Sequence, residues 1–324
     1  MTHYAPMVAA LVSGLLTLVL LLSKAGKEVQ DIPNERSLHE TPVPRIGGVG
    51  MMAGILTGWA LMFKLLTWWI ALPAVVLFLV SLLDDVKGLS VGKRLSAHVA
   101  AALILVFGSG MLEQYPFLAV AMLLAAVWMT NLFNFMDGSD GLAGGMALIG
   151  FTMYGAASLM HEDENQAMIN FAVSSAALGF LFHNFYPAKV FMGDAGSIPL
   201  GFLAAAMGLW GWQHDTWPAW FPVLVFSPFI VDATATLAKR SVRGARVTEA
   251  HREHYYQRMV QMGWGHRNVA FAEYALMLAA GASAIWAERQ SAEFPWGLLL
   301  AWACTYAAIM LTLDYRWRAF QRGA

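Results

Sequence analysis

Three short acidic segments contain the residues of this chain that are best suited to chemistry. Asp84-Asp85 directly follows an apolar run, the segment from Asn131 to Asp140 contains two aspartates and two asparagines, and Asp194 lies in a glycine-rich segment. Charged residues make up only 13% of the sequence, so each acidic cluster beside a long apolar segment needs a reason. Carboxylate oxygens suit Mg²⁺ and Mn²⁺, and such ions bridge phosphate oxygens. We therefore expect a divalent metal and a phosphate-bearing substrate.

Glycines surround two of these clusters. The segments 137–141 (Asp-Gly-Ser-Asp-Gly) and 193–197 (Gly-Asp-Ala-Gly-Ser) each lead into an apolar stretch. Glycine lets the backbone approach a ligand closely, and free N–H groups at a helix start favour phosphate. The alternative is an ordinary helix cap, with Asp140 or Ser197 at the N-cap, and the two roles are compatible. For Gly47-Gly48 a ligand role and simple helix packing are equally supported.

A polar and basic loop near residue 250 supplies the histidines. His251 and His254 are three residues apart, so on a helix they would share a face. With Arg252 beside them they are suited to phosphate contacts; a basic segment lying on anionic lipid is the alternative. Asp232 is a carboxylate within an apolar stretch, which favours a functional role, although it lies near enough to the stretch's end to reach the interface.

Long apolar segments must position these residues. The chain is 58% hydrophobic with a mean hydropathy of +0.55, far above a soluble domain of this length. Apolar stretches of close to the roughly 20 residues that span a bilayer occur at about 4–23, 46–63, 66–83, 95–112, 115–132, 142–160, 167–184, 198–214, 217–237, 269–287 and 295–313. They lack the alternation of a membrane barrel, so helices are expected. We predict an all-α polytopic membrane protein with about 11 transmembrane helices, forming a single domain over residues 1–324.

The basic residues predict the orientation. All of the 20 lysines and arginines except Lys64 and Arg289 lie in alternate connections or in the tail. The positive-inside rule places these connections in the cytoplasm, with the N-terminus outside and the C-terminus inside. The acidic clusters fall on the same side. The loops expected to form the active-site face are 24–45, 84–94, 132–141, 185–197 and 238–268.

Two other classes compete with an enzyme. An ion-coupled transporter would place its acidic residues near the bilayer midplane on interrupted helices, whereas most acids here lie at helix ends. A scaffold protein has no use for five clustered carboxylates. Ion pairing or solvation explains one acidic pair well, but it explains five carboxylates on one face poorly.

Several motifs, taken together, resemble a known family. They are Asp84-Asp85, Asn131-x-x-Asn134-x-x-Asp137-Gly-x-Asp140-Gly, Phe191-Met-Gly-Asp194-x-Gly-Ser197, the loop at His251, and an early segment with Asn34-x-Arg36-Ser37-x-His39 and Pro42-x-Pro44-Arg45-x-Gly47-Gly48. In this order the motifs resemble those of the polyprenyl-phosphate N-acetylhexosamine-1-phosphate transferases (glycosyltransferase family 4). The resemblance covers about residues 30 to 270.

The resemblance implies a reaction and its partners. A UDP-sugar would give its sugar-1-phosphate to undecaprenyl phosphate and release UMP, with Mg²⁺, or alternatively Mn²⁺, as cofactor. It implies a multi-pass protein of the bacterial inner membrane with its site facing the cytoplasm, and no nucleic-acid partner. A homodimer is left open, as is the choice between direct attack by the lipid phosphate and a covalent aspartyl intermediate.

The resemblance also implies roles for individual residues. The metal ligands would be Asp194 and Asp85. The catalytic set would be Asp84, Asp85, Asp137, Asp140, His251 and His254, in which Asp84 manages the acceptor phosphate and the histidines face the diphosphate. The substrate-binding set would be Asn131, Asn134, Phe191 (stacked on uracil), Asn184, His39, Arg45, Lys87, Arg94 and Arg252.

Two departures from the peptidoglycan branch of the family favour its O-antigen branch. The lysine that follows the first aspartate by four positions is replaced by Gly88, with Lys87 one residue earlier. The loop at His251 reads His-Arg-Glu-His in place of consecutive histidines. We expect a role in O-antigen or related lipopolysaccharide biosynthesis, with the peptidoglycan-type (cell wall) transferase as the alternative. The sugar is open among N-acetylglucosamine, N-acetylfucosamine and N-acetylquinovosamine.

Overall fold

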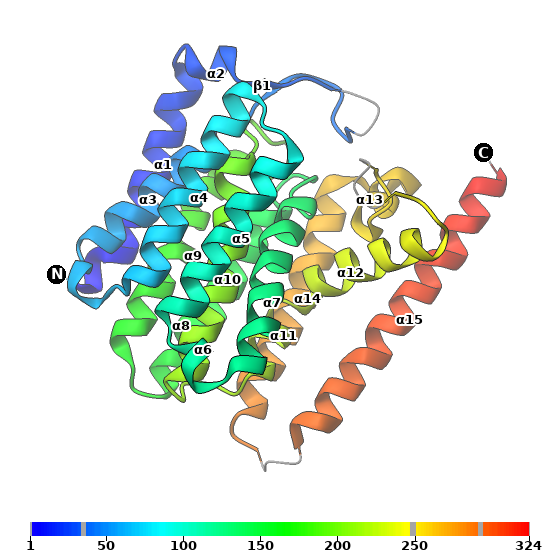
Figure 1. The fold of residues 1–324 in the computed structure, drawn as a ribbon. Helices are drawn as coiled ribbons and strands as arrows, with labels where there is room; N and C mark the ends of the chain where they lie inside the picture. Colours follow the sequence, from blue (N-terminus) through cyan, green and yellow to red (C-terminus); the bar gives the residue numbers. More distant parts are fainter. Residues whose placement is uncertain (1, 34–36, 247–250, 291–293, 324) are drawn as a thin grey trace.

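The fold comes from a computed structural model, which describes residues 2–33, 37–246, 251–290 and 294–323. Helices make up nearly all of its regular structure (Figure 1). The helices of more than one short turn are α1 (Ala5–Leu22), α3 (Gly47–Ala60), α4 (Trp68–Lys87), α5 (Val91–Gly108), α7 (Pro116–Phe135), α8 (Leu142–Met160), α9 (Glu164–Asn184), α10 (Asp194–Gln213), α11 (Trp220–Val225), α12 (Ser227–Val242), α14 (Gly265–Ala287) and α15 (Phe294–Gly323). The short elements are α2 (Ala25–Glu28), α6 (Met111–Gln114), α13 (Tyr255–Met259) and an antiparallel pair, β1 (Gln30–Asp31) with β2 (Val43–Pro44). The predicted all-α class is confirmed.

Each of the eleven predicted apolar stretches is helical, but two differ from a simple span. Within the described residues, nine helices are long and apolar enough to cross a membrane, and those at 46–63 and 217–237 are not among them. Helix α3 has 14 residues, which gives a length of about 21 Å. The other stretch is divided into α11 and α12. Pro228 lies in the first turn of α12, where proline is tolerated, whereas it interrupts a helix interior.

Small residues bring α1 against α9. The Ser13 hydroxyl donates to the carbonyl of Ala176 at 2.7 Å, and a Cβ on Gly179 would lie 3.0 Å from the backbone nitrogen of Gly14. Close approach through small residues is how helices associate in a bilayer, where apolar side chains gain little from leaving lipid.

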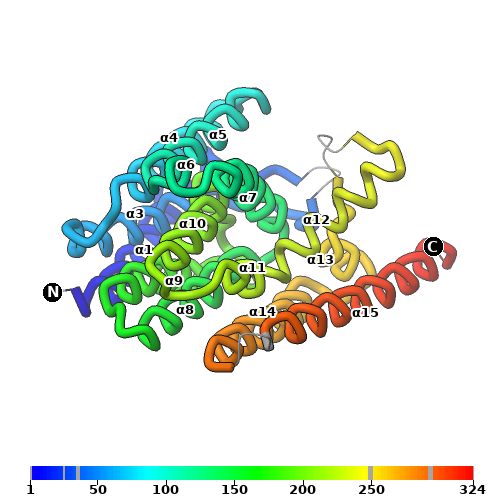
Figure 2. The backbone as a smooth tube through the Cα atoms, turned by 60° about the horizontal axis from the view of Figure 1, so that its bottom comes forward, coloured from blue at the N-terminus to red at the C-terminus, as the bar shows by residue number. Residues whose placement is uncertain are grey.

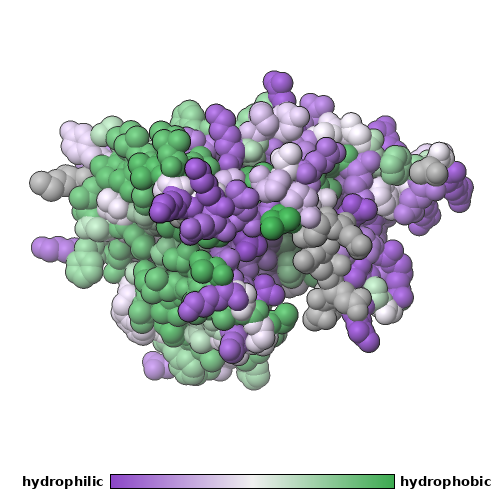
Figure 3. Space-filling model, turned by 90° about the horizontal axis from the view of Figure 1, so that it is seen from above, coloured by the Kyte–Doolittle hydropathy of each residue, from purple (hydrophilic) through white to green (hydrophobic). Residues whose placement is uncertain are grey.

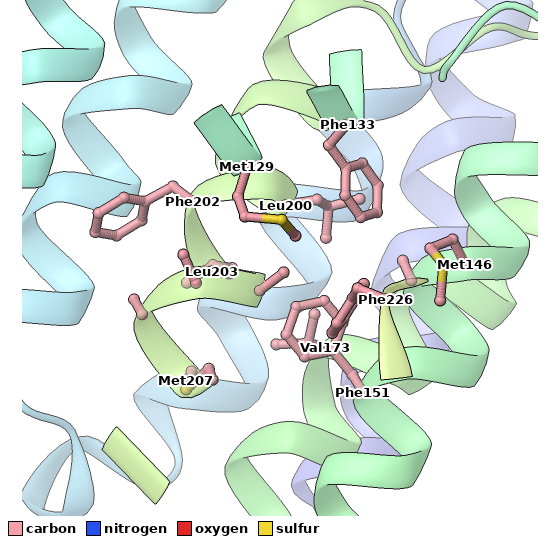
Figure 4. Packing of buried hydrophobic residues seen from close by; sticks show 14 of the residues in the cluster. Met129, Phe133, Met146, Phe151, Val173, Leu200, Phe202, Leu203, Met207 and Phe226 are labelled. Carbon is pink, nitrogen blue, oxygen red and sulfur yellow. The ribbon is translucent and has the colours of Figure 1, made fainter. Parts of the chain in front are cut away.

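Helix α10 forms the centre of the bundle. Its residues from Ala195 to Gly211 are buried, and it contacts α3, α4, α7 and α8 (Figure 2). Figure 4 shows apolar side chains of these central helices gathered in one cluster, among them Phe133, Phe151 and Leu200. Asp194 is the first residue of α10, so the best-packed helix of the fold holds one of the predicted acidic residues at its end.

The predicted active-site loops gather at one end of the bundle, the upper end in Figure 1. The short connections between α4 and α5, α7 and α8, and α9 and α10 lie there with β1 and α13. Viewed from above this end, hydrophilic side chains cover the middle and right of the face, and apolar ones cover much of the left (Figure 3). The shared side predicted for these loops therefore agrees with the fold.

Asp84 and Asp85 differ from their predicted place in a loop. They lie in the last turn of α4, which ends at Lys87. Gly88 follows with a φ of 68°, and its N–H donates to the carbonyl of Asp84 at 2.8 Å. A lysine at this position would be strained, because a positive φ disfavours side chains with a Cβ.

Candidate active site

A polar cavity of about 750 Å³ opens at the end of the bundle where the loops gather. Helices α5 and α7 and the segment before α13 contribute to its wall. The predicted residues that line it are His39, Arg94, Asn131, Asn134, Asp137, Asn184, Phe191, His251 and His254. The tertiary structure therefore brings together side chains from five separate stretches of sequence.

Arg94 joins two of the acidic clusters on one wall of the cavity. Its Nη1 lies 3.4 Å from an oxygen of Asp84 and 3.4 Å from an oxygen of Asp194. The other oxygen of Asp194 accepts a hydrogen bond of 2.8 Å from the amide of Asn134. The first three predicted motifs thus meet at Asp194, which is not itself among the residues that line the cavity.

Asp85 holds the start of α10. Its two carboxylate oxygens accept the backbone N–H groups of Asp194 at 3.2 Å and Ala195 at 2.9 Å. Arg45 lies beside it, with Nε 3.3 Å from Asp85 Oδ1. A carboxylate at a helix N-terminus satisfies N–H groups that have no partner in the helix and interacts favourably with the helix dipole. The observed contacts of Asp85 and Arg45 therefore position Asp194.

Asp137 lines the cavity as a carboxylate surrounded by other acids. Burial raises the pKa of Asp137 well above its usual range, and the charges of Asp194, Asp85 and Asp31 raise it further. Both effects disfavour the ionised form. A cation placed near these carboxylates would remove the repulsion.

The donor set fits a hard divalent cation. The four carboxylates of Asp84, Asp85, Asp137 and Asp194 are accompanied by only two guanidinium groups, so two negative charges are not offset. Charges held in such a place are costly unless compensated, and oxygen-only donors suit Mg²⁺. Among the described residues no three His, Cys, Asp or Glu side chains are grouped as a ready-made metal site.

His251 and His254 lie side by side at the cavity, with ring centroids 4.9 Å apart. The prediction that a helix places them on one face is wrong, because the segment before α13 is not helical and α13 begins only at Tyr255. Burial, with the neighbouring His254 and Arg240 acting in the same direction, lowers the pKa of His251 to about 4. His251 therefore meets the cavity as a neutral ring near pH 7.

Two predicted residues, Asn184 and Asp140, form hydrogen bonds that connect two of the loops. Asn184 accepts from the N–H of Gly141 at 3.0 Å and donates to the carbonyl of Val190 at 2.9 Å. Asp140 accepts from the N–H of Ala188 at 3.0 Å. These contacts join the connection before α8 to the connection before α10. Asn184 also reaches the cavity wall, and Asp140 does not.

Other predicted residues lie away from the cavity. Lys87 and Arg252 are exposed, and neither lines its wall. Asn34 and Arg36 of the early motif lie outside the described residues. His39 and Phe191 do meet, with ring centroids 4.9 Å apart in an edge-to-face arrangement.

Comparison with known proteins agrees with this geometry. The model of glycosyl transferase family 4 matches residues 67–211. Over these residues the chain is similar to glycosyl transferase family 4. The chain is 28% identical to the probable undecaprenyl-phosphate N-acetylglucosaminyl 1-phosphate transferase of Bacillus subtilis, over 86% of this chain and 84% of that protein. It is 29% identical to the undecaprenyl-phosphate alpha-N-acetylglucosaminyl 1-phosphate transferase of Escherichia coli K12, over 80% and 77%. It is 28% identical to the phospho-N-acetylmuramoyl-pentapeptide-transferase of Levilactobacillus brevis, over 75% and 83%.

The cavity also contains residues that the sequence analysis did not select. They include Asp31, His98, Trp128, Ser139 and Gln257. His98 follows Arg94 by one helical turn, so helical spacing could have placed it on the same face. Asp31 and Trp128 carry no such signal, because only the folded chain brings β1 and the middle of α7 to this wall.

A second cavity of about 510 Å³ lies beside the first. Its lining is almost entirely apolar and comes from α7, α10, α11 and α12, with residues such as Leu118, Met122 and Val223. Trp128 lines both cavities, and its indole N–H donates to the hydroxyl of Thr234 on α12 at 3.1 Å. A polar and an apolar cavity therefore meet at one side chain.

Proposed function

We propose that this protein transfers a sugar-1-phosphate, an N-acetylated hexosamine or deoxyhexosamine, from a UDP-sugar to undecaprenyl phosphate and releases UMP. The observation that carries the proposal is the meeting of the polar and apolar cavities at Trp128. A reaction between a water-soluble nucleotide sugar and a phosphate on a lipid chain needs both environments side by side. The names of the Bacillus subtilis and Escherichia coli relatives support the same reaction class.

The polar cavity suits the donor. Its volume of about 750 Å³ falls in the range typical of small-molecule sites, which is roughly 300–1,000 Å³. Asn131 and Asp137 supply hydrogen-bonding groups for the sugar, and Phe191 supplies an aromatic ring for the uracil. His254 and Arg94 lie on the same wall to meet the diphosphate.

The apolar cavity suits the first isoprene units of the acceptor. Two of the helices that line it, α7 and α10, are long enough to span the bilayer, so a polyprenyl chain would enter it from lipid. The phosphate of that lipid then reaches the polar cavity near Trp128.

The chemistry follows from these positions. An oxygen of the lipid phosphate attacks the phosphorus that carries the sugar, the bond from that phosphorus to the UMP oxygen breaks, and UMP leaves. Phosphoryl transfer depends mainly on positioning and on neutralising charge. Asp194 would hold Mg²⁺ (or Mn²⁺), with Asp84 in place of the predicted Asp85, because both oxygens of Asp85 accept N–H groups at the start of α10. When bound, the ion would neutralise the diphosphate and the leaving UMP. Arg94 contacts both carboxylates, and Asp84 would position the acceptor phosphate.

A covalent route through an aspartate is the alternative to direct attack. It predicts a sugar phosphate bound to the protein when the UDP-sugar is supplied without lipid. Mass spectrometry of the intact protein after such an incubation separates the two routes, because direct attack leaves the mass unchanged.

The pathway we propose is O-antigen or related surface polysaccharide synthesis at the cytoplasmic face of the bacterial inner membrane. The basic connections at the loop end support this orientation. A peptidoglycan-type reaction is the second candidate, and the relative from Levilactobacillus brevis favours it. Gly88, with its positive φ, favours the first candidate, because the lysine typical of the peptidoglycan branch does not suit that backbone.

The test is release of UMP by the purified protein in lipid nanodiscs. UDP-N-acetylglucosamine, UDP-N-acetylfucosamine, UDP-N-acetylquinovosamine and UDP-N-acetylmuramoyl-pentapeptide are supplied in turn with undecaprenyl phosphate and Mg²⁺. We expect turnover that requires the lipid, ceases with EDTA, returns with Mg²⁺ and is lost in Asp194→Asn. The control is Asp215→Asn at the opposite end of α10, where a φ of 54° suits asparagine. The absence of UMP release with every donor would refute the proposal, and activity that survives both EDTA and Asp194→Asn would refute the metal assignment.

A further inference from the structure

Asp232 of α12 is a buried carboxylate that the proposed chemistry does not use. Only 7% of its surface is exposed, yet four hydrogen-bond donors converge on it. Oδ1 accepts from Thr236 Oγ1 at 3.1 Å, from the N–H of Tyr255 at 2.9 Å, and lies 3.2 Å from His254 Nδ1. Oδ2 accepts from the N–H of Tyr256 at 3.0 Å. These contacts account for both oxygens.

The contacts fix which nitrogen of His254 carries a hydrogen. Backbone N–H groups can only donate, and an ionised carboxylate that accepts from them has no hydrogen of its own to donate. The contact with Asp232 therefore requires a hydrogen on Nδ1 of His254, which leaves Nε2 as the ring nitrogen available to a ligand. His254 lines the polar cavity. Its ring is stacked between Phe135 and Tyr256, with centroid distances of 6.2 and 5.9 Å, so its orientation is restricted as well.

We propose that Asp232 is a positioning residue of the active site, which holds His254 with Nδ1 protonated and Nε2 directed to the phosphates of the donor. This inference rests on the proposed function. When Nε2 takes a proton from solvent, it donates to a phosphate oxygen, and the carboxylate of Asp232 stabilises the resulting imidazolium. In Ser-His-Asp triads an aspartate likewise holds the tautomer and orientation of a catalytic histidine and stabilises its protonated form.

A purely structural role for Asp232 makes a different prediction. The carboxylate caps the start of α13, and a cap alone would stabilise that helix without any link to His254. Helix α13 is also held from its other side by Asp314 of α15, which accepts from Arg258 Nη1 at 2.9 Å and pairs with Lys239. Asp314 has no contact with His254 among the interactions of the described residues, so Asp314→Asn loosens the same helix by an independent route.

The test is a double-mutant cycle on kcat for UMP release. We expect Asp232→Asn to lower kcat by about 10- to 100-fold, with the KM for undecaprenyl phosphate unchanged. In a His254→Gln background the same substitution is expected to have no further effect on kcat, because residues that act as a unit are not additive. Asp314→Asn should lower the thermal midpoint and combine multiplicatively with His254→Gln. Independent losses from Asp232→Asn and His254→Gln, or a wild-type kcat in Asp232→Asn, would overturn the proposal.

A second measurement does not depend on turnover. Nitrogen-15 NMR of histidine-labelled protein, with His254→Gln used to assign the signal, should show His254 protonated at Nδ1 in the wild type and altered in Asp232→Asn. An unchanged tautomer would refute the inference even if the enzyme is active, whereas the expected signal without UMP release would count only against the proposed function. If Asp232→Asn does not fold, Thr236→Val removes one hydrogen bond from Asp232 and keeps the carboxylate. The same cycle then predicts a smaller loss of kcat that again disappears in His254→Gln.

Discussion

Replacing Gly48 with alanine is expected to displace the backbone that carries Asp194. Gly47 and Gly48 begin α3, and their N–H groups donate to the carbonyls of Phe191 at 2.9 Å and Met192 at 2.8 Å. These contacts support helix packing as the reason for the two glycines. They also connect that packing to the active site, because the segment that they hold leads directly into Asp194.

The size of the effect follows from the space at this contact. A Cβ on residue 48 would lie 2.4 Å from the Gly196 backbone nitrogen and 2.6 Å from the Met192 carbonyl oxygen. Ordinary contact begins near 3.4 Å, so the two backbones must separate by about 0.8–1.0 Å. Overpacking of this kind costs about 1–3 kcal/mol, which corresponds to a fall in the thermal midpoint of about 2–6 °C. A misplacement approaching 1 Å lowers catalytic rates by about 100-fold.

The assay pairs UMP release with thermal unfolding of the nanodisc-embedded protein. Gly92→Ala is the matched control, because Gly92 lies in α5 at the same end and a Cβ there would meet nothing within 4 Å. We expect Gly92→Ala to keep the rate and the thermal midpoint, and Gly48→Ala to lower both. Wild-type rate and stability in Gly48→Ala would refute the reasoning, since it would mean that the contact between α3 and the start of α10 does not fix the position of Asp194.

Two further predictions follow from charged groups. Arg94→Ala should reduce kcat by about 100-fold or more, because the guanidinium lies between Asp84 and Asp194. Arg94→Lys should reduce it by less, because lysine keeps the positive charge but loses the planar, bidentate guanidinium. Equal rates in the two variants and the wild type would contradict a role for Arg94 in joining the two carboxylates. At the opposite end of the bundle, burial raises the pKa of the Glu288 carboxyl to about 8. Neither of its oxygens has a hydrogen-bond partner within the described residues, although His161 Nε2 lies 3.6 Å from Oε2. The folded state therefore keeps a proton that the unfolded state loses near pH 4.5, so this contribution to stability is present below that pH and is lost as the pH rises to about 8. Thermal midpoints measured from pH 5 to 8 should fall less steeply in Glu288→Gln than in the wild type, and parallel curves would exclude Glu288 as the cause.

Much of the fold was predictable because insertion in a bilayer is decided locally. A run such as 66–83 is apolar over its own length, and its backbone can satisfy its hydrogen bonds only within itself, so a helix follows from the run alone. The same reasoning does not predict that α3 is short or that 217–237 is divided into α11 and α12. Those features depend on packing against neighbouring helices and on Pro228, which lies in the first turn of α12.

The sequence by itself determined which residues gather at the site. Glycine-flanked aspartates and asparagines at the ends of apolar runs, together with alternating basic connections, were enough to place Asp84, Asn134, Asp137 and Asp194 on one face. Helical periodicity and the even number of crossings between these segments require that result, whatever the details of packing.

Only the tertiary structure decided what each side chain does there. Asp84 and Asp85 are neighbours in sequence, yet one pairs with Arg94 and the other holds the first N–H groups of α10. Asp232 and His254 are 22 residues apart and are hydrogen-bonded. A hydrogen bond needs atoms placed to within a few tenths of an ångström, and that precision arises from the packing of helices distant in sequence, which no local pattern encodes.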